Sequence, residues 1–218
     1  MTSSLGSQRM ERILLQAMEE VLGEQGLRSV FQAAHVLAGD GAAGSESTGI
    51  LWPESRPIPF GAAPASSFVG CTLAAFEDVY GNLAGRGLAL RVGRALFAYG
   101  LREYGAELGL TGAAFRLLPF PNKLRTFGSA LAQLFNEADQ KRLEIEEQKG
   151  RLLVHLLRCP FCLERPQARA SCELAAGLAE ESLYWLSGGK IFEVDAIACA
   201  ERGDAGCTLQ IEQAPIFS

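Results

Sequence analysis

The sequence is poor in several features that would point to a particular function. Only two of its 218 residues are histidine, and only two are tryptophan. Its 20 Lys and Arg residues are outnumbered by 25 Asp and Glu, and the formal net charge is −5. Because a basic surface is the usual means of attracting nucleic acid or an anionic membrane, we expect neither as a partner.

Targeting segments and long apolar runs are also missing. The most apolar stretch, residues 87–101, is interrupted by Arg91 and Arg94, which excludes an ordinary membrane-spanning helix. The polar first seven residues contain no apolar core of a secretory signal. We therefore expect no transmembrane segment and a soluble, cytoplasmic protein, in which thiols stay reduced.

No familiar catalytic motif stands out. No glycine-rich nucleotide fingerprint follows a predicted strand, and neither a Ser-His-Asp order nor a pair of catalytic carboxylates is evident. A reductase would need a hydride source, and the sequence shows no place for nicotinamide or flavin. Enzymatic activity stays open, and a binding protein is favoured.

Apolar periodicity predicts an α+β fold. Helical spacing in the first two thirds of the chain is followed by short alternating runs, which are typical of strands. The predicted helices cover residues 10–22, 27–37, 72–82, 87–108, 124–135 and 167–186, and the predicted strands cover 141–147, 151–158, 190–200 and 207–212. We expect N-terminal helices packed on an antiparallel sheet of about four strands, with a helix inserted between the two hairpins.

The chain is long enough for one compact unit with two parts. Residues 1–70 would hold the N-terminal helices and an irregular connection, since residues 38–70 are rich in Gly, Ala, Ser and Pro. Residues 71–218 would form a ligand-binding domain.

Five of the six cysteines fall within 49 residues near the C-terminus. They are Cys159, Cys162, Cys172, Cys199 and Cys207. In a reducing compartment such clustering predicts metal ligands or reactive thiols before disulfides, and four tetrahedral thiolates suit zinc. The alternative is that these are buried, inert cysteines, because free cysteine is among the most buried residue types. Because four thiolates leave no open position for water, we expect a structural zinc and no metal-based catalysis.

The same segment resembles the 4-vinyl-reductase domain family. The resemblance rests on Cys159-Pro-Phe-Cys162, on Cys172 at the start of a helix, on Trp185-Leu186, and on the closing Cys199, Gly203, Asp204 and Cys207. Residues 91–94 and 115–119 look like the branch linked to bacteriochlorophyll synthesis and photosynthesis. The resemblance implies a fold shared with hydrocarbon-sensing domains and with vesicle-tethering (TRAPP-like) subunits, a homodimer, and a zinc near an apolar pocket.

One departure from the family pattern concerns the metal. The resemblance implies a carboxylate three residues before Cys199, where this chain has Ala196. Cys159 or Cys162 could replace it, Asp195 could reach in through a bulge, or the metal could be lost. We favour Cys172, Cys199 and Cys207 with one thiol of the Cys159-Cys162 pair.

Five residues are candidates for contacts with a ligand. Arg91 and Arg94, three apart on one predicted helix, could bind a carboxylate such as a tetrapyrrole propionate. Phe127 and Trp185 could line an aromatic cavity, and His155 could orient a ring or bind its metal. Each also has a simpler reading as an exposed helix face or a core residue.

These observations lead to three hypotheses. The first is a zinc-stabilised protein that binds a tetrapyrrole or another apolar ligand as an accessory in bacteriochlorophyll biosynthesis. The second is a 4-vinyl reductase, an oxidoreductase acting on a chlorophyllide-like substrate with an external electron donor. The third is a sensor domain for aromatic hydrocarbons.

Overall fold

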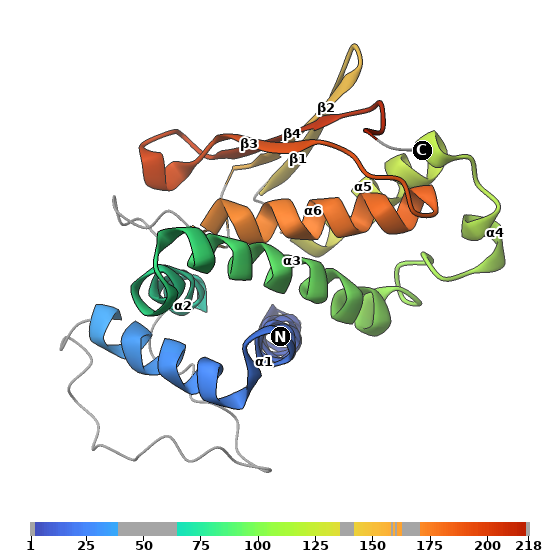
Figure 1. The fold of residues 1–218 in the computed structure, drawn as a ribbon. Coiled ribbons are helices and arrows are strands. Elements are labelled where there is room, and N and C mark those ends of the chain that lie inside the picture. Colours follow the sequence, from blue (N-terminus) through green and yellow to red (C-terminus); the bar gives the residue numbers. More distant parts are fainter. Residues whose placement is uncertain are drawn as a thin grey trace.

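Helices and an antiparallel sheet lie in successive layers (Figure 1). The computed structural model describes residues 3–38, 65–135, 142–157, 159, 161–162 and 171–216. The helices are α1 (Ser3–Ala38), α2 (Ala65–Tyr80), α3 (Asn82–Tyr104), α4 (Ala113–Arg116), α5 (Phe120–Phe135) and α6 (Ser171–Ser187), with a short 3-10 turn η2 (Ala200–Arg202). The strands are β1 (Leu143–Gln148), β2 (Arg151–Leu156), β3 (Val194–Ala198) and β4 (Cys207–Glu212).

The N-terminal helices form the layer farthest from the sheet. The predicted break near residue 23 is a kink inside α1, where Gly23 has φ 68° and ψ 169°. Glycine tolerates this positive φ because it has no Cβ. The two halves of α1 pack on α2 and α3 around a core that includes Ile13, Met18, Leu27 and Phe76.

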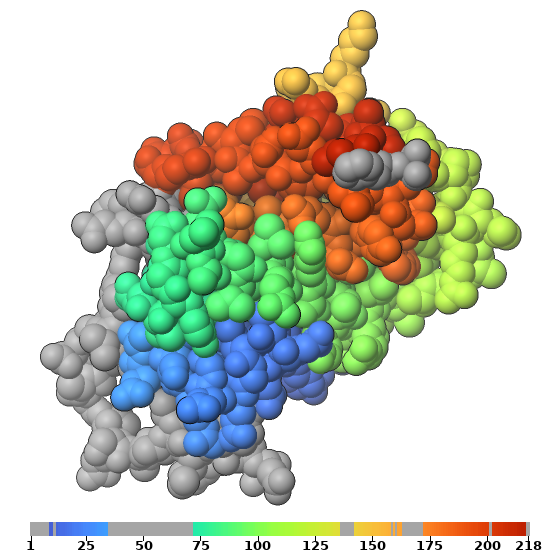
Figure 2. Space-filling model, in the orientation of Figure 1, coloured from blue at the N-terminus to red at the C-terminus, as the bar shows by residue number. Residues whose placement is uncertain are grey.

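The sheet has strand order β1-β2-β4-β3, and every neighbouring pair is antiparallel. The β1–β2 turn contains Gly150 at φ 80° and projects beyond the body of the molecule (Figure 2). Along β2 and β4 every second residue faces α6, on what we call the inner face; Leu156 and Cys207, which pair across the two strands, are examples. Residues between them, such as His155 and Thr208, lie on the opposite, outer face.

The register of β3 against β4 is interrupted between Ala196 and Ala198. Asp195, opposite Gln210, is exposed on the outer face, whereas Cys199 is buried. Strict alternation would place residues 195 and 199 on one face of a strand, but here Asp195 and Cys199 lie on opposite faces. The irregularity changes the parity of the strand just before the cysteine.

Helix α6 lies between the sheet and the other helices and packs closely on α3. Cβ atoms placed on Gly93 and Gly177 would clash with the carbonyl oxygens of Leu174 and Leu90, respectively. Ion pairs from Arg86 to Glu173 and from Arg94 to Glu180 flank this contact. The two backbones therefore approach each other without intervening side chains.

The predicted fold class is confirmed: the chain is α+β, with a four-stranded antiparallel sheet and a helix between its two hairpins. The helices differ from the prediction mainly at their ends, with α2 and α3 separated only by Gly81 at φ 79°. The predicted connection at residues 38–70 lies largely outside the described residues. Among the helices that the structure describes, none is long and apolar enough to cross a membrane.

Candidate ligand cleft and thiol cluster

Four cysteines that are distant in sequence meet at one end of the sheet. The Sγ atoms of Cys162, Cys172, Cys199 and Cys207 all lie within 4.8 Å of one another. Cys172 comes from the first turn of α6, Cys199 and Cys207 flank the β3–β4 turn, and Cys162 follows β2. We call these four residues the thiol cluster. The predicted gathering of cysteines is thus present in the fold.

Backbone groups position the β3–β4 side of the thiol cluster. The turn ends at Gly203 with φ 94°, which returns the chain towards β4. The Asp204 carboxylate accepts a hydrogen bond of 2.7 Å from the Cys199 N–H, and the Ala200 N–H donates to Cys207 Sγ at 3.4 Å. The Gly-Asp pair that follows Cys199 in sequence therefore has a structural role: it holds the two cysteines across a tight turn.

Thiol–thiol hydrogen bonds make the cysteines inequivalent. Contacts with Cys159, Cys162 and Cys172 lower the pKa of Cys207 below its ordinary value. The pKa values of Cys159 and Cys172 are raised, because their hydrogen bonds with Cys162 and Cys207 and their burial favour the protonated thiol. Cys159 is thus in contact with the thiol cluster as a fifth sulfur.

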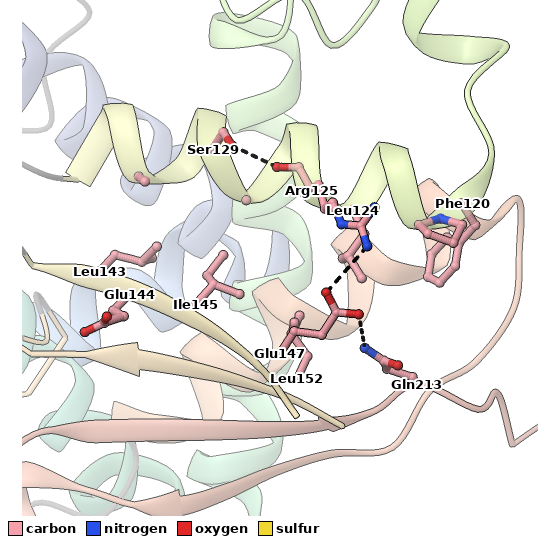
Figure 3. Close-up of a pocket in the computed structure, with 13 residues that line it drawn as sticks. Phe120, Leu124, Arg125, Ser129, Leu143, Glu144, Ile145, Glu147, Leu152 and Gln213 are labelled. Atoms are coloured by element: carbon pink, nitrogen blue, oxygen red, sulfur yellow. Dashed lines mark hydrogen bonds and ion pairs between the residues drawn. The ribbon is translucent and has the colours of Figure 1, made fainter. Parts of the chain in front are cut away.

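A separate cleft lies between α5 and the β1–β2 hairpin (Figure 3). Its volume is about 650 Å³, within the usual range for small-molecule sites. Apolar side chains form much of its surface, including Phe120 and Leu124 from α5 and Leu143, Ile145 and Leu152 from the inner face of the hairpin.

Polar groups gather at one part of the cleft. Glu147 lies 3.7 Å from an Arg125 guanidinium nitrogen and accepts a 3.5 Å hydrogen bond from Gln213 Nε2 (Figure 3). Ser129 donates to the Arg125 carbonyl oxygen. Glu144 also lines the cleft, but it alternates onto the outer face of β1, so the charged side chains on the inner face are Arg125 and Glu147. Their charges cancel, and the cleft therefore favours a neutral ligand over an anionic one.

The residues predicted to bind a ligand are dispersed, and none of them lines this cleft. Arg91 is exposed on α3, while Arg94 pairs with Glu180 at 2.7 Å. Phe127 and Trp185 both contact the Phe97 ring in an aromatic cluster. His155 is on the outer face of the sheet, 3.1 Å from Thr208 Oγ1.

The residues that line the cleft were not predicted from the sequence as a ligand site. A signal was present in β1, where Leu143, Ile145 and Glu147 alternate on one face. A carboxylate at the end of an apolar, inward-facing series indicates that this end of the strand lies beside a polar site. Arg125 could not be paired with it in advance, because the position of α5 over β1 depends on tertiary packing.

No protein-family model and no curated protein matches the chain. Solved structures do match, and they are haem-nitric oxide/oxygen binding (H-NOX) proteins. The unliganded Fe(II) H-NOX protein from K. algicida is 12% identical, with 97% of this chain and 98% of that chain covered and a TM-score of 0.52. The S. oneidensis H-NOX protein in its Fe(II)NO state is 14% identical, with coverages of 92% and 97% and a TM-score of 0.52.

A further H-NOX structure, from work on haem distortion, is 12% identical, covers 96% of both chains and has a TM-score of 0.55. At such low identity these matches establish a shared fold. They overturn the assignment to the 4-vinyl-reductase family, and with it the roles in bacteriochlorophyll synthesis and vinyl reduction. The resemblance had followed a local cysteine pattern, whereas the arrangement of helices and strands along the chain is that of the H-NOX structures.

The expectation of a structural zinc is likewise not supported, since the matched structures are named for haem and for an Fe(II)NO state and give no indication of zinc. The role of the five cysteines as metal ligands stays a prediction, as does the homodimer. What the structure adds is their geometry: the sulfurs are assembled, and Asp195 is not among them.

Haem itself fits the cleft poorly. Haem iron in proteins is held by His, Cys, Met or Tyr, and none of these is among the 13 residues lining the cleft. His155 faces the other side of the sheet. The cleft also offers one cation for the two haem carboxylates. The described residues therefore supply neither an axial ligand nor a matching charge for haem in this cleft.

Proposed function

We propose that this chain is a small-molecule-binding domain whose ligand lies in the cleft between α5 and the β1–β2 hairpin. The observation that carries the proposal is the cleft itself, about 650 Å³ in volume and walled largely by apolar side chains. Support also comes from the shared fold, because the solved structures that match nearly the whole chain are named as haem- and NO-binding proteins.

The lining chemistry defines the class of ligand. Apolar walls such as Leu124, Ile145 and Leu152 favour a compact apolar molecule. Glu147 and Arg125 would meet a polar edge of that molecule after their mutual ion pair opens. That opening is inexpensive, because both side chains are more than half exposed and such pairs contribute about 0–1 kcal/mol. The ligand is therefore neutral, apolar and equipped with a hydrogen-bonding group, and it binds without iron coordination.

The proposal is tested with the neutral fluorescent probe N-phenyl-1-naphthylamine. We expect saturable fluorescence enhancement with the wild-type chain. Ser129→Trp, which places a large ring at the cleft, should weaken binding by about tenfold, or about 1.4 kcal/mol. Thr126→Trp on the same helix is the matched control, because Thr126 is exposed and does not line the cleft, and it should bind like wild type.

A second titration, with haemin, tests whether the cleft binds haem instead of a neutral apolar ligand. Because the cleft lining supplies no axial ligand, added haemin should give no absorption spectrum of an iron coordinated in the cleft. Stoichiometric, axially ligated haemin in the wild-type chain would contradict the proposal, particularly if Ser129→Trp abolished it. Equal probe affinity in the two tryptophan variants would also reject the cleft as the binding site.

A further inference from the structure

We propose that the thiol cluster is a peroxide-sensitive redox site, in which Cys162 and Cys207 form a disulfide. Their Sγ atoms lie 3.1 Å apart, and Cys162 is 3.8 Å from Cys199. A disulfide requires about 2.05 Å, so the pair must close by about 1 Å. The inference is independent of the cleft and of any ligand bound there.

The two cysteines differ in how they are held and how they are reached. Cys207 is 2% exposed and begins β4, where its backbone pairs with Leu156 of β2. Cys162 is partly exposed and lies outside the strands. The small approach that a disulfide needs can therefore come from Cys162, and a dissolved oxidant reaches Cys162 before it reaches Cys207.

The chemistry balances with a peroxide as the oxidant. The Cys162 sulfur attacks hydrogen peroxide, the O–O bond breaks, and the products are Cys162 sulfenic acid and one water. The Cys207 sulfur then attacks the sulfenic sulfur, forming the S–S bond and releasing a second water. Overall, two thiols lose two electrons and two protons to one peroxide, which becomes two water molecules.

The distances single out Cys162 and Cys207 as a close pair within the thiol cluster. Four thiolates at about 2.3 Å from one ion lie about 3.8 Å from each other. The Cys162–Cys199 separation matches that value, whereas Cys162 and Cys207 are closer, at 3.1 Å, and all four sulfurs lie within 4.8 Å of one another. Cys159 adds a fifth sulfur in contact with Cys162 and Cys207, one more than such a shell accommodates.

The test uses the full chain, exposed to hydrogen peroxide and then alkylated under denaturing conditions. We expect the oxidised protein to lose two alkylatable thiols. A tryptic map should join the peptide that begins at Cys159 to the peptide 203–218, which contains Cys207. This mapping requires no substitution, so it does not depend on a variant that folds.

Single substitutions assign the pair. Cys162→Ser and Cys207→Ser should slow the loss of thiols by at least tenfold. Cys159→Ser should still form the disulfide, and Cys71→Ser, which keeps all five C-terminal cysteines, serves as the matched control. Circular dichroism verifies that each variant is folded.

Three results would overturn the inference. The first is an unchanged thiol count after peroxide, and the second is a disulfide that joins a different pair, such as Cys159 with Cys162. The third is a stoichiometric metal ion, found by elemental analysis of the untreated protein, that must be chelated before peroxide acts.

Discussion

Two helix contacts of this molecule are built in opposite ways. At the α3–α6 contact, Gly93 and Gly177 bring two helix backbones together, and any added Cβ meets a carbonyl oxygen. At the α5–β1 contact, a Cβ on Gly128 would meet only the end of the Ile145 side chain, and a cleft of about 650 Å³ remains beside it. Rigid backbone contact closes one side of the fold, whereas adjustable side chains leave the other side open to a ligand.

The largest predicted contrast compares a core side chain with a cleft side chain. Phe76 is fully buried among α1, α2 and α3, so Phe76→Ala should cost about 4 kcal/mol of unfolding free energy. Ile145→Ala should cost less than about 2 kcal/mol, because part of its surface already borders the cleft. Urea unfolding of the two variants measures the difference, and equal costs would mean that the cleft is as tightly packed as the core.

Glycine substitutions test the two contacts directly. Gly177→Ala should lower the unfolding free energy by about 3 kcal/mol, since the new methyl group meets the Leu90 backbone. Gly128→Ala should cost less than about 1 kcal/mol, because Ile145 can rotate and alanine favours the helix. Gly87→Ala is the control: this α3 glycine has open space around it, and the change should stabilise the helix by up to about 1 kcal/mol. A Gly177→Ala variant as stable as wild type would refute the close α3–α6 contact.

The same contrast explains what the sequence could and could not predict. The fold class followed from periodicity, because inward and outward residues of β2 and β4 alternate without interruption. The gathering of cysteines could be anticipated, since Cys199 and Cys207 flank one turn and Cys172 lies at the start of α6, the helix that precedes β3. The cleft could not, because it depends on how far α5 is held from β1. Nor could the placement of Cys199 on the opposite face from Asp195, which depends on a local irregularity in β3.

A buried tyrosine on α3 also predicts how the stability of the fold responds to alkaline pH. Burial on α3 raises the pKa of Tyr104 above its ordinary value. The unfolded chain then loses this proton first, at a pH of about 10, so the contribution of Tyr104 to stability is complete below that pH. It is lost as the pH rises from there through the higher pKa of the folded state. Tyr104→Phe should therefore reduce the loss of stability above about pH 10.

Tyr184→Phe on α6 is the matched control for this measurement, because Tyr184 is about half exposed. Urea midpoints recorded from neutral to alkaline pH should fall less steeply for Tyr104→Phe than for Tyr184→Phe. Parallel curves for the two variants would show that burial of Tyr104 does not contribute to the alkaline transition.

The smallest expected effect concerns the ion pair at the cleft. Glu147→Gln removes the charge that holds Arg125, and should change the unfolding free energy by less than about 0.5 kcal/mol, because the pair is exposed. Probe association should nevertheless become faster, since Arg125 no longer has to leave a carboxylate before the ligand enters. Glu146→Gln is the control, because Glu146 is one residue away on the opposite face of β1. Stopped-flow fluorescence separates the two variants. An unchanged association rate for Glu147→Gln would mean that the ion pair does not control access of the ligand to the cleft.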